Sequence, residues 1–329
     1  MKLRNSRRGV AMLMAAACTT LVAACGLQSG SAVPLDVNPG SIQPVAGLKG
    51  AQLTVGSKDF TEQVILGYII EFAMTAAGAD VRDLTNIQGS NSTHQAMLNG
   101  QVDLTYEYTG TDWINYLGHE KPIQDPVAQF EAVKKESLAK ENIVWVDPAP
   151  MDNTYALAMN QQTAKETGAK TLSDYAALVK KDPAKAKTCL ETEFNSRQDG
   201  FPGMAAAYGF DPAKAQTSIL QTGIIYSATA AGNECKFGEV FTTDGRILGL
   251  NLVVLTDDKQ FFPHYNATLN IRKSIADKYP DIAKVMKPIS DALTNAEITK
   301  LNANVDVDGQ DPARVARQWM VDKGFVTVG

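Results

Sequence analysis

The sequence is poor in the residues from which metal centres and catalytic sites are usually built. Its 329 residues include three His and four Cys, with no Cys-x-x-Cys pair, which argues against a zinc site. It also lacks a Gly-x-Ser-x-Gly elbow, a His-Glu-x-x-His pair, a phosphate-cradling loop and a dinucleotide fingerprint. We therefore predict no catalytic residues, no cofactor and no bound metal, and structural roles for His94, His119 and His264.

A basic excess is also missing. The chain has 31 Lys and Arg against 36 Asp and Glu, a net charge of -5, whereas a surface that binds nucleic acid needs clustered positive charge. We therefore predict no nucleic acid partner. The hydrophobic fraction of 44% is ordinary, and the length allows two domains with proper cores. We expect a globular monomer.

The N-terminal residues have the pattern of a secretory signal. Basic residues precede a mostly apolar, uncharged stretch from Gly9 to Ala24, and Cys25 follows. Roughly 15 apolar residues are too few to span a bilayer, which needs about 20. Residues 21–25 (Leu-Val-Ala-Ala-Cys) resemble the lipobox of bacterial lipoproteins. We predict a signal peptide over 1–24, a lipid on Cys25, and a place on the extracytoplasmic face of the bacterial cell membrane.

Residues 26–50 contain five Gly, three Pro and three Ser and show no helical or strand periodicity. Such a composition is typical of a flexible linker. The sequence therefore predicts a lipid-anchored tether over 25–50, followed by a globular part with no further segment able to span the membrane.

From residue 51 onward strand and helix patterns alternate, which predicts an α/β fold with mostly parallel strands. A buried strand is expected over 52–56, and Asp59 with Glu62 predicts the start of a helix that ends at Gly78. A further helix is predicted over 126–141 and a strand over 143–146, closed by two prolines. We expect two lobes, 51–151 plus 256–329 and 152–255, with a ligand between them.

Polar and aromatic side chains gather where predicted strands end. Three such segments are 57–59 (Ser-Lys-Asp), 106–111 (Tyr-Glu-Tyr-Thr-Gly-Thr) and 195–200 (Asn-Ser-Arg-Gln-Asp-Gly). Ligands of open α/β sheets bind beyond the carboxyl ends of the strands, and a helix that begins there favours anionic groups. These segments are therefore the predicted binding site.

These segments also carry a family resemblance. Residues 56–63 (Gly-Ser-Lys-Asp-Phe-Thr-Glu-Gln) resemble the opening motif of the quaternary-ammonium substrate-binding proteins of ABC importers, the ProX and OpuC type. Further blocks similar to that family follow in order over the rest of the chain: 107–111, 153–156, 193–200, 243–247 and 257–263. The resemblance implies a two-lobed, type II binding-protein fold that captures glycine betaine, choline or carnitine and delivers it to a permease with a separate ATPase.

The resemblance also implies roles for single residues. Tyr108, Tyr155 and Tyr265 match the positions of an aromatic cage around a trimethylammonium group, and Phe241 stands where relatives commonly have another Tyr. The positions that match a carboxylate-binding set are Lys58, Thr111 and Arg197. A quaternary ammonium has no N–H to donate, so aromatic faces suit its diffuse charge. In this family Thr rather than Asp at position 111 implies a preference for betaines over choline.

Two alternatives to betaine binding remain open at this point. One is a binding protein for amino acids or another small solute, with Glu107 or Asp112 facing the α-ammonium group. The other is a secreted enzyme. Whichever holds, Cys189 and Cys235 precede strands of the same predicted lobe, and a compartment outside the cytosol favours a disulfide between them.

Overall fold

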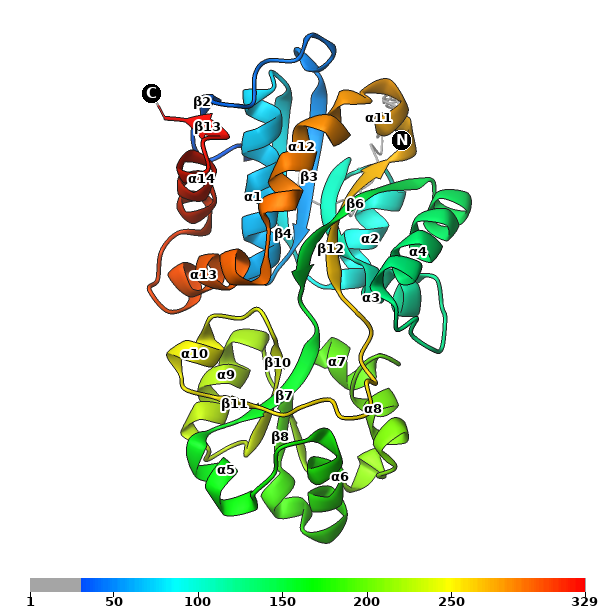
Figure 1. Ribbon diagram of the computed structural model, residues 1–329, viewed down its shortest axis with the longest axis vertical. Helices are drawn as coiled ribbons and strands as arrows, with labels where there is room; N and C mark the ends of the chain where they lie inside the picture. Colours follow the sequence, from blue (N-terminus) through cyan, green and yellow to red (C-terminus); the bar gives the residue numbers. More distant parts are fainter. Residues whose placement is uncertain (1–30, 329) are drawn as a thin grey trace, which may run out of the picture.

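The computed structural model describes residues 31–328, so the predicted signal peptide and Cys25 lie outside the described residues. Two lobes are visible, each built on its own sheet with helices on its faces (Figure 1). The chain passes between them at the junctions from β6 to β7 and from β11 to β12 (Figure 1). The α/β, two-lobed architecture expected from the sequence is therefore confirmed.

The first lobe is built on a six-stranded sheet in the order β1-β4-β3-β5-β12-β6. Its strands are β1 (Ser31–Ala32), β3 (Gln52–Lys58), β4 (Asp80–Ile87), β5 (Leu104–Tyr108), β6 (Ile143–Asp152) and β12 (Asn266–Arg272). The helices of this part of the chain are α1 (Thr61–Ala76), α2 (Ser90–Leu98), α3 (Thr109–Thr111), the π-helical turn η2 (Asp112–Tyr116), α4 (Pro126–Glu141), α11 (Lys273–Lys278), α12 (Asp281–Ala292), α13 (Asn295–Asp306) and α14 (Pro312–Asp322).

The second lobe is built on a five-stranded sheet in the order β11-β7-β10-β8-β9. Its strands are β7 (Tyr155–Met159), β8 (Thr188–Leu190), β9 (Thr217–Ile219), β10 (Phe237–Phe241) and β11 (Val253–Val254). Its helices are α5 (Gln161–Thr167), α6 (Leu172–Lys181), α7 (Thr192–Ser196), α8 (Phe201–Tyr208), α9 (Thr222–Ala231) and α10 (Arg246–Gly249), with short 3-10 turns η3 (Pro183–Ala186) and η4 (Pro212–Lys214).

Helix α1 forms where the sequence predicts it but begins differently. The helix is buried on nearly all sides, as expected of one that is apolar all round, because it packs against the sheet and also against α12, α13 and α14. The predicted cap by Asp59 is wrong: Phe60 is the N-cap residue, and no side chain caps the helix. Glu62 turns instead into the interior, where it is 2% exposed.

Strand directions are mixed rather than mostly parallel. β3 runs parallel to β4 and β5, and β8 runs parallel to β9 and β10. β12 is antiparallel to both of its neighbours, and β7 is antiparallel to β10 and β11. β1 is antiparallel to β4 as well. The strands that flank the two crossings between lobes, β6, β7, β11 and β12, all pair antiparallel with a neighbour in their sheet.

Strand β6 is longer than predicted, because it continues to Asp152 through both prolines. A proline cannot donate to a strand ladder, but it is tolerated on an edge strand or at a bulge. β6 is the edge strand of its sheet, and its register with β12 shifts twice. Pro148 and Pro150 were the reason for predicting that the strand ends at Val146, and at an edge strand this reason does not apply.

The tether predicted over 25–50 is wrong from residue 31 onward. β1 pairs with β4, β2 (Asn38–Pro39) pairs with β13 (Val326–Thr327), and a 3-10 turn η1 (Ala46–Leu48) follows. Ile42 and Leu48 are buried in the main core. From residue 31 onward this segment is therefore packed against the first lobe by its buried apolar residues and its strand pairs.

A disulfide joins Cys189 of β8 to Cys235 just before β10, with the two Cα atoms 5.6 Å apart. The closed loop spans 46 positions of the chain, and the chain-entropy model gives such a bridge about 3–4 kcal/mol of stabilisation. Within residues 31–328, a helix of the length and apolarity required to cross a membrane is not found.

Candidate ligand-binding site

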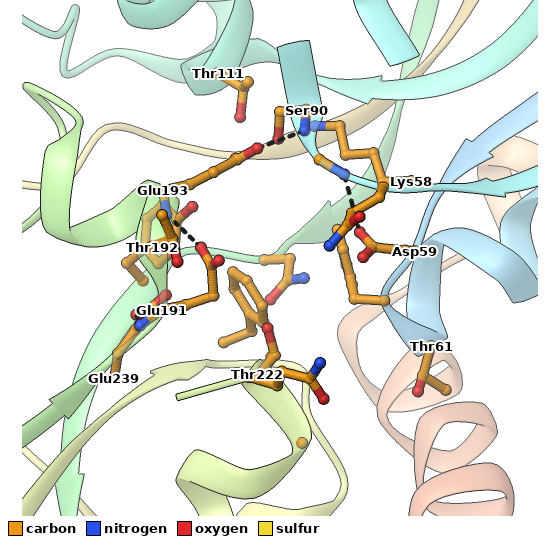
Figure 2. Close-up of a pocket in the computed structure, with 18 of the residues that line it drawn as sticks. Lys58, Asp59, Thr61, Ser90, Thr111, Glu191, Thr192, Glu193, Thr222 and Glu239 are labelled. Atoms are coloured by element: carbon orange, nitrogen blue, oxygen red, sulfur yellow. Dashed lines mark hydrogen bonds between the residues drawn. The ribbon is translucent and has the colours of Figure 1, made fainter. Parts of the chain in front are cut away.

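A cavity of about 580 Å³ lies between the lobes, at the ends of β3 and β5 on one side and of β8 and β10 on the other. Figure 2 shows polar side chains from both lobes pointing into it. The seven residues predicted to bind a ligand all line this cavity: Lys58, Tyr108, Thr111, Tyr155, Arg197, Phe241 and Tyr265. The fold therefore brings them together, while their contact with a ligand stays a prediction.

Aromatic rings form one part of the lining. Tyr155 lies 5.2 Å from Phe241 and 5.3 Å from Tyr265 between ring centroids, and it stands edge-on to Tyr265 at 86°. Phe60 stacks on Phe241 at 5.1 Å and on Tyr108 at 6.2 Å. We call these five residues, Phe60, Tyr108, Tyr155, Phe241 and Tyr265, the aromatic set. Their spacing is that of rings in mutual contact.

Phe60 is the member of the aromatic set that the sequence prediction missed. It lies within the motif at 56–63, two residues beyond Lys58, the last residue of β3. The strand-end rule applied one residue further would have found it. Its ring bridges Tyr108 of the first lobe and Phe241 of the second, so it joins the two halves of the aromatic set.

Lys58 reaches the cavity as half of an ion pair. Its Nζ atom lies 2.6 Å from Glu107 Oε1, and both side chains are only 4% exposed. The second oxygen of Glu107 accepts a hydrogen bond from the Tyr116 hydroxyl at 3.1 Å. The Lys58 ammonium also lies 5.1 Å from the centroid of the Tyr108 ring. A ligand carboxylate would therefore meet a neutralised pair rather than a free cation.

Arg197 is paired in the same way. Its guanidinium donates through two nitrogens to Asp199, whose Oδ2 also accepts from the Tyr265 hydroxyl at 2.7 Å. Arg197 Nη2 also lies 3.4 Å from Thr111 Oγ1 across the cavity. Among the described residues, Nη1 has only a longer contact, 3.7 Å from Glu193. We call Lys58, Glu107, Arg197 and Asp199 the charged set.

Three glutamates of the second lobe also line the cavity, and the sequence prediction did not assign them to the site: Glu191, Glu193 and Glu239. We call them the acidic set. Figure 2 shows them on the side opposite Lys58. Glu193 Oε1 accepts from the Ser90 backbone N–H at 2.6 Å, which links α7 to the N-terminus of α2 across the cavity. Burial raises the pKa of Glu239 to about 8; the hydrogen bond from the Glu191 backbone N–H acts to lower this pKa, and the Glu191 charge acts to raise it.

Glu62 lies directly behind the aromatic set and connects the lobes. Its carboxylate accepts from the Tyr108 hydroxyl and from Asn153 Nδ2, both at 2.8 Å, and from Thr243 Oγ1 at 2.5 Å and Asn302 Nδ2 at 3.0 Å. Burial raises its pKa, although all four hydrogen bonds act to lower it. The four donors come from β5, the crossing between lobes, the loop after β10, and α13, so one carboxylate fixes a ring and the hinge together.

The two residues proposed for an amino-acid ammonium group do not reach this cavity. Glu107 is engaged by Lys58, and Asp112 is 1% exposed. Neither is among the residues that line the pocket. The alternative that places an α-ammonium group against Glu107 or Asp112 is therefore not supported by the geometry.

Comparison with known proteins agrees with this arrangement. A family model described as the substrate binding domain of ABC-type glycine betaine transport systems matches residues 51–322. The chain belongs to this family. One relative, the glycine-betaine-binding protein of Pseudomonas aeruginosa, is 35% identical over 281 residues, which cover 84% of this chain and 89% of that protein.

Other relatives vary in length and in the ligand for which they are named. The ergothioneine transport permease/ergothioneine binding protein EgtU of Helicobacter pylori is 32% identical over 283 residues, 86% of this chain but 49% of that longer protein. The solved structure of apo YehZ from Escherichia coli superposes with a TM-score of 0.62 at 26% identity, covering 84% of this chain and all of that one. The family's two-lobed fold is thus the fold found here.

Proposed function

We propose that this chain is the extracytoplasmic receptor that captures glycine betaine or a related quaternary-ammonium compound and passes it to an ABC permease driven by a separate ATPase. The observation that carries the proposal is the convergence of the aromatic set on one cavity between two lobes. It acts by binding and release and is not an enzyme.

The aromatic set suits a cation that cannot donate hydrogen bonds. Each desolvated ring contributes about 2 kcal/mol or less to binding a quaternary ammonium. Micromolar affinity corresponds to roughly 8 kcal/mol, before the losses of motion on association are counted. Several rings therefore supply much of the required free energy, and a second contact must supply the rest.

That second contact is the ligand carboxylate. The Arg197 guanidinium and the Thr111 hydroxyl are the donors best placed for it. Nη2 of Arg197 lies 3.4 Å from Thr111 Oγ1 across the cavity, and Nη1 has only the longer contact with Glu193 among the described residues. Charge-assisted bonds of this kind are stronger than neutral ones. Lys58 adds a weaker, longer-range attraction, since Glu107 already neutralises it. Because Glu107 and Asp199 neutralise Lys58 and Arg197, these two side chains repel the ligand's ammonium group less, and it can approach the nearby rings.

Capture involves closure of the lobes over the ligand. In support, bonds already cross the cavity from Glu193 to the Ser90 N–H and from Arg197 to Thr111. Glu62 then acts as a positioning residue, because it holds the Tyr108 hydroxyl and the donors on the hinge at once. We assign 51–151 plus 256–329 to the first lobe, with 31–50 added, and 152–255 to the second.

Delivery requires that the receptor stay near its permease. We propose that residues 1–24 are a signal peptide and that a lipid on Cys25 anchors the mature chain, as a monomer, to the outer face of the cell membrane. The sequence pattern at 21–25 supports this. Metabolic labelling with a radioactive fatty acid tests it: the wild-type chain should incorporate label, and Cys25→Ser should not.

Titration calorimetry with matched ligands tests the proposed function. Glycine betaine and glycine differ only in three N-methyl groups, so their comparison isolates the contribution of the aromatic set. Carnitine and ergothioneine are titrated in the same series. We expect glycine betaine to bind with micromolar or better affinity and glycine not to bind measurably. Equal binding of glycine, or of another amino acid, would move the cation site to the acidic set and overturn the proposal.

A further inference from the structure

A second cluster of ionisable groups lies behind the wall of the cavity, outside the ligand site. It consists of His94 on α2, Asp112 at the start of η2 and Glu141 at the end of α4. One potential metal-ligating atom from each residue lies within 4.8 Å of the other two. His94 Nε2 is 3.0 Å from Glu141 Oε1. None of the three lines the cavity between the lobes.

Each histidine of the chain faces a carboxylate, and the other two pairs serve for comparison. His119 and Glu136 lie 3.0 Å apart near the surface, and Lys140 neutralises the same glutamate at 2.6 Å. His264 contacts Asp152 at 2.6 Å with its side chain 38% exposed. The His94 and Glu141 side chains are only 9% and 13% exposed. Within the described part of the chain, this is also the one histidine pair joined by a third ligating residue.

The cluster lacks a balancing positive charge. No Lys or Arg of residues 31–328 forms an ion pair with Asp112 or Glu141. Asp112 Oδ2 is buried without a hydrogen-bond partner among the described residues. Lys58 is the nearby cation that acts on Asp112, but it is engaged by Glu107. Buried, unpaired carboxylate oxygens are costly unless a proton or a cation satisfies them.

The surroundings of Glu141 hold it in place. Ser137 Oγ donates to Glu141 Oε2 at 3.1 Å, and Trp145 Nε1 donates to Ser137 Oγ at 3.1 Å. On the other side the His94 ring stacks on Tyr116 at 3.8 Å. Such outer contacts are typical of residues that orient metal ligands. Glu141 also borders a surface depression of about 350 Å³, which gives an ion a route from solvent.

We propose that His94, Asp112 and Glu141 bind a divalent transition metal ion of the zinc type. Imidazole nitrogen and carboxylate oxygen are both ligands of Zn²⁺, and one water would complete a tetrahedral site with these three residues. The ion replaces the missing positive charge and ties α2, η2 and α4 together. Its role is structural, because the cluster does not open into the ligand cavity. The prediction of no bound metal rested on the three His residues and the lack of a Cys-x-x-Cys pair, and a site built from one His and two distant carboxylates leaves neither sign in the sequence.

Zinc titration of the tag-free mature protein, freed of metal with a chelator, tests this proposal. We expect the wild-type chain to bind one equivalent of Zn²⁺, and His94→Gln and Asp112→Asn each to abolish measurable binding at that site. Ser137→Ala, which removes an outer hydrogen bond, should weaken binding by about tenfold. His119→Gln is the matched control, since it removes a histidine that also faces a glutamate, and it should bind as the wild type does.

Two results would overturn the proposal. A wild-type chain that binds no zinc in this titration would mean that a proton, and no metal, satisfies Asp112. Equal zinc binding by wild type, His94→Gln and Asp112→Asn would place the ion elsewhere. Because the first measurement uses the wild-type protein, poor folding of a variant does not remove the test.

Discussion

The aromatic set and the charged set line the same cavity, but their side chains are held in different ways. The rings pack on one another and need no partner of opposite charge to stay buried. In the charged set, each cation is already bound to an acid, Lys58 to Glu107 and Arg197 to Asp199. Loss of a ring should therefore affect mainly binding, whereas loss of a buried cation leaves an unpaired acid and should affect folding as well.

The largest expected effect is that of Arg197→Ala. The side chains of Arg197 and Asp199 are 5% and 1% exposed, so the variant leaves a buried carboxylate without its cation. Breaking a buried pair from one side lowers the free energy of unfolding by about 3–5 kcal/mol. Urea denaturation measures this loss, and binding of glycine betaine should weaken in the same variant.

A double variant separates the pair from the single cation. Arg197→Ala combined with Asp199→Ala removes both charges and should recover part of the lost stability. A loss of unfolding free energy below about 1 kcal/mol in Arg197→Ala alone, which is the value of an exposed pair, would contradict the claim that the charged set affects folding more than the aromatic set does.

The next effect concerns the acidic set and depends on pH. The pKa of Glu239 in the folded chain is about 8, above its ordinary value of 4.5, so the folded state holds this proton more tightly than the unfolded state. The resulting stability is complete at low pH and is lost as the pH rises from about 4.5 to about 8. Glu239→Gln keeps an acceptor for the Glu191 N–H but cannot ionise, so it should lose less.

Thermal unfolding of wild type and Glu239→Gln at pH 5 and pH 8 measures this difference. One pKa unit corresponds to about 1.4 kcal/mol, and we expect a gain of roughly 2 kcal/mol for the variant at pH 8 relative to pH 5, less than the full shift because the pocket admits water. Parallel pH profiles of the two proteins would show that Glu239 ionises normally.

The aromatic set gives a smaller effect that is confined to binding. Tyr155→Ala and Tyr108→Ala each remove a ring face from a desolvated cation, which should cost about 1–2 kcal/mol, or roughly five- to thirtyfold in affinity. Tyr155→Phe keeps the ring and is the matched control, with affinity close to that of the wild type. Unchanged betaine affinity in both folded alanine variants would refute the cage.

The smallest effect is expected at Thr111, where the ligand classes are distinguished. Its hydroxyl can donate to a carboxylate, and an Asp there would repel it. Wild type should bind glycine betaine more tightly than choline, and Thr111→Asp should narrow that difference, while the uncharged Thr111→Asn should change it less. Competition titration of glycine betaine against choline measures this preference. Displacement of glycine betaine by an equal or lower concentration of choline would contradict the role given to Thr111.

The site residues at or near the ends of strands could be predicted from the sequence. Lys58 and Tyr108 end the buried strands β3 and β5, Arg197 follows the short helix α7 after β8, and Tyr155 begins the buried strand β7. Chain-local signals therefore indicate where each residue stands. These signals do not tell which side chains from distant parts of the chain come into contact. The pairing of Lys58 with Glu107 and the hydrogen bonds that converge on Glu62 were therefore found only in the fold.

Some misses left a usable signal and others did not. Glu239 lies two residues before Phe241 in β10, and alternate residues of a strand share a face, so the assignment of Phe241 to the cavity already pointed to Glu239. The segment 31–50 and strand β12 are different, because their structure depends on partners distant in the chain. Composition alone cannot supply such contacts.

A crystal structure of the complex with glycine betaine tests the central claim most directly. We predict the trimethylammonium nitrogen within about 6 Å of several ring centroids of the aromatic set, and the carboxylate at Arg197 Nη1 and Thr111 Oγ1. A ligand cation lying instead against Glu191, Glu193 and Glu239, with the aromatic set unengaged, would contradict the account.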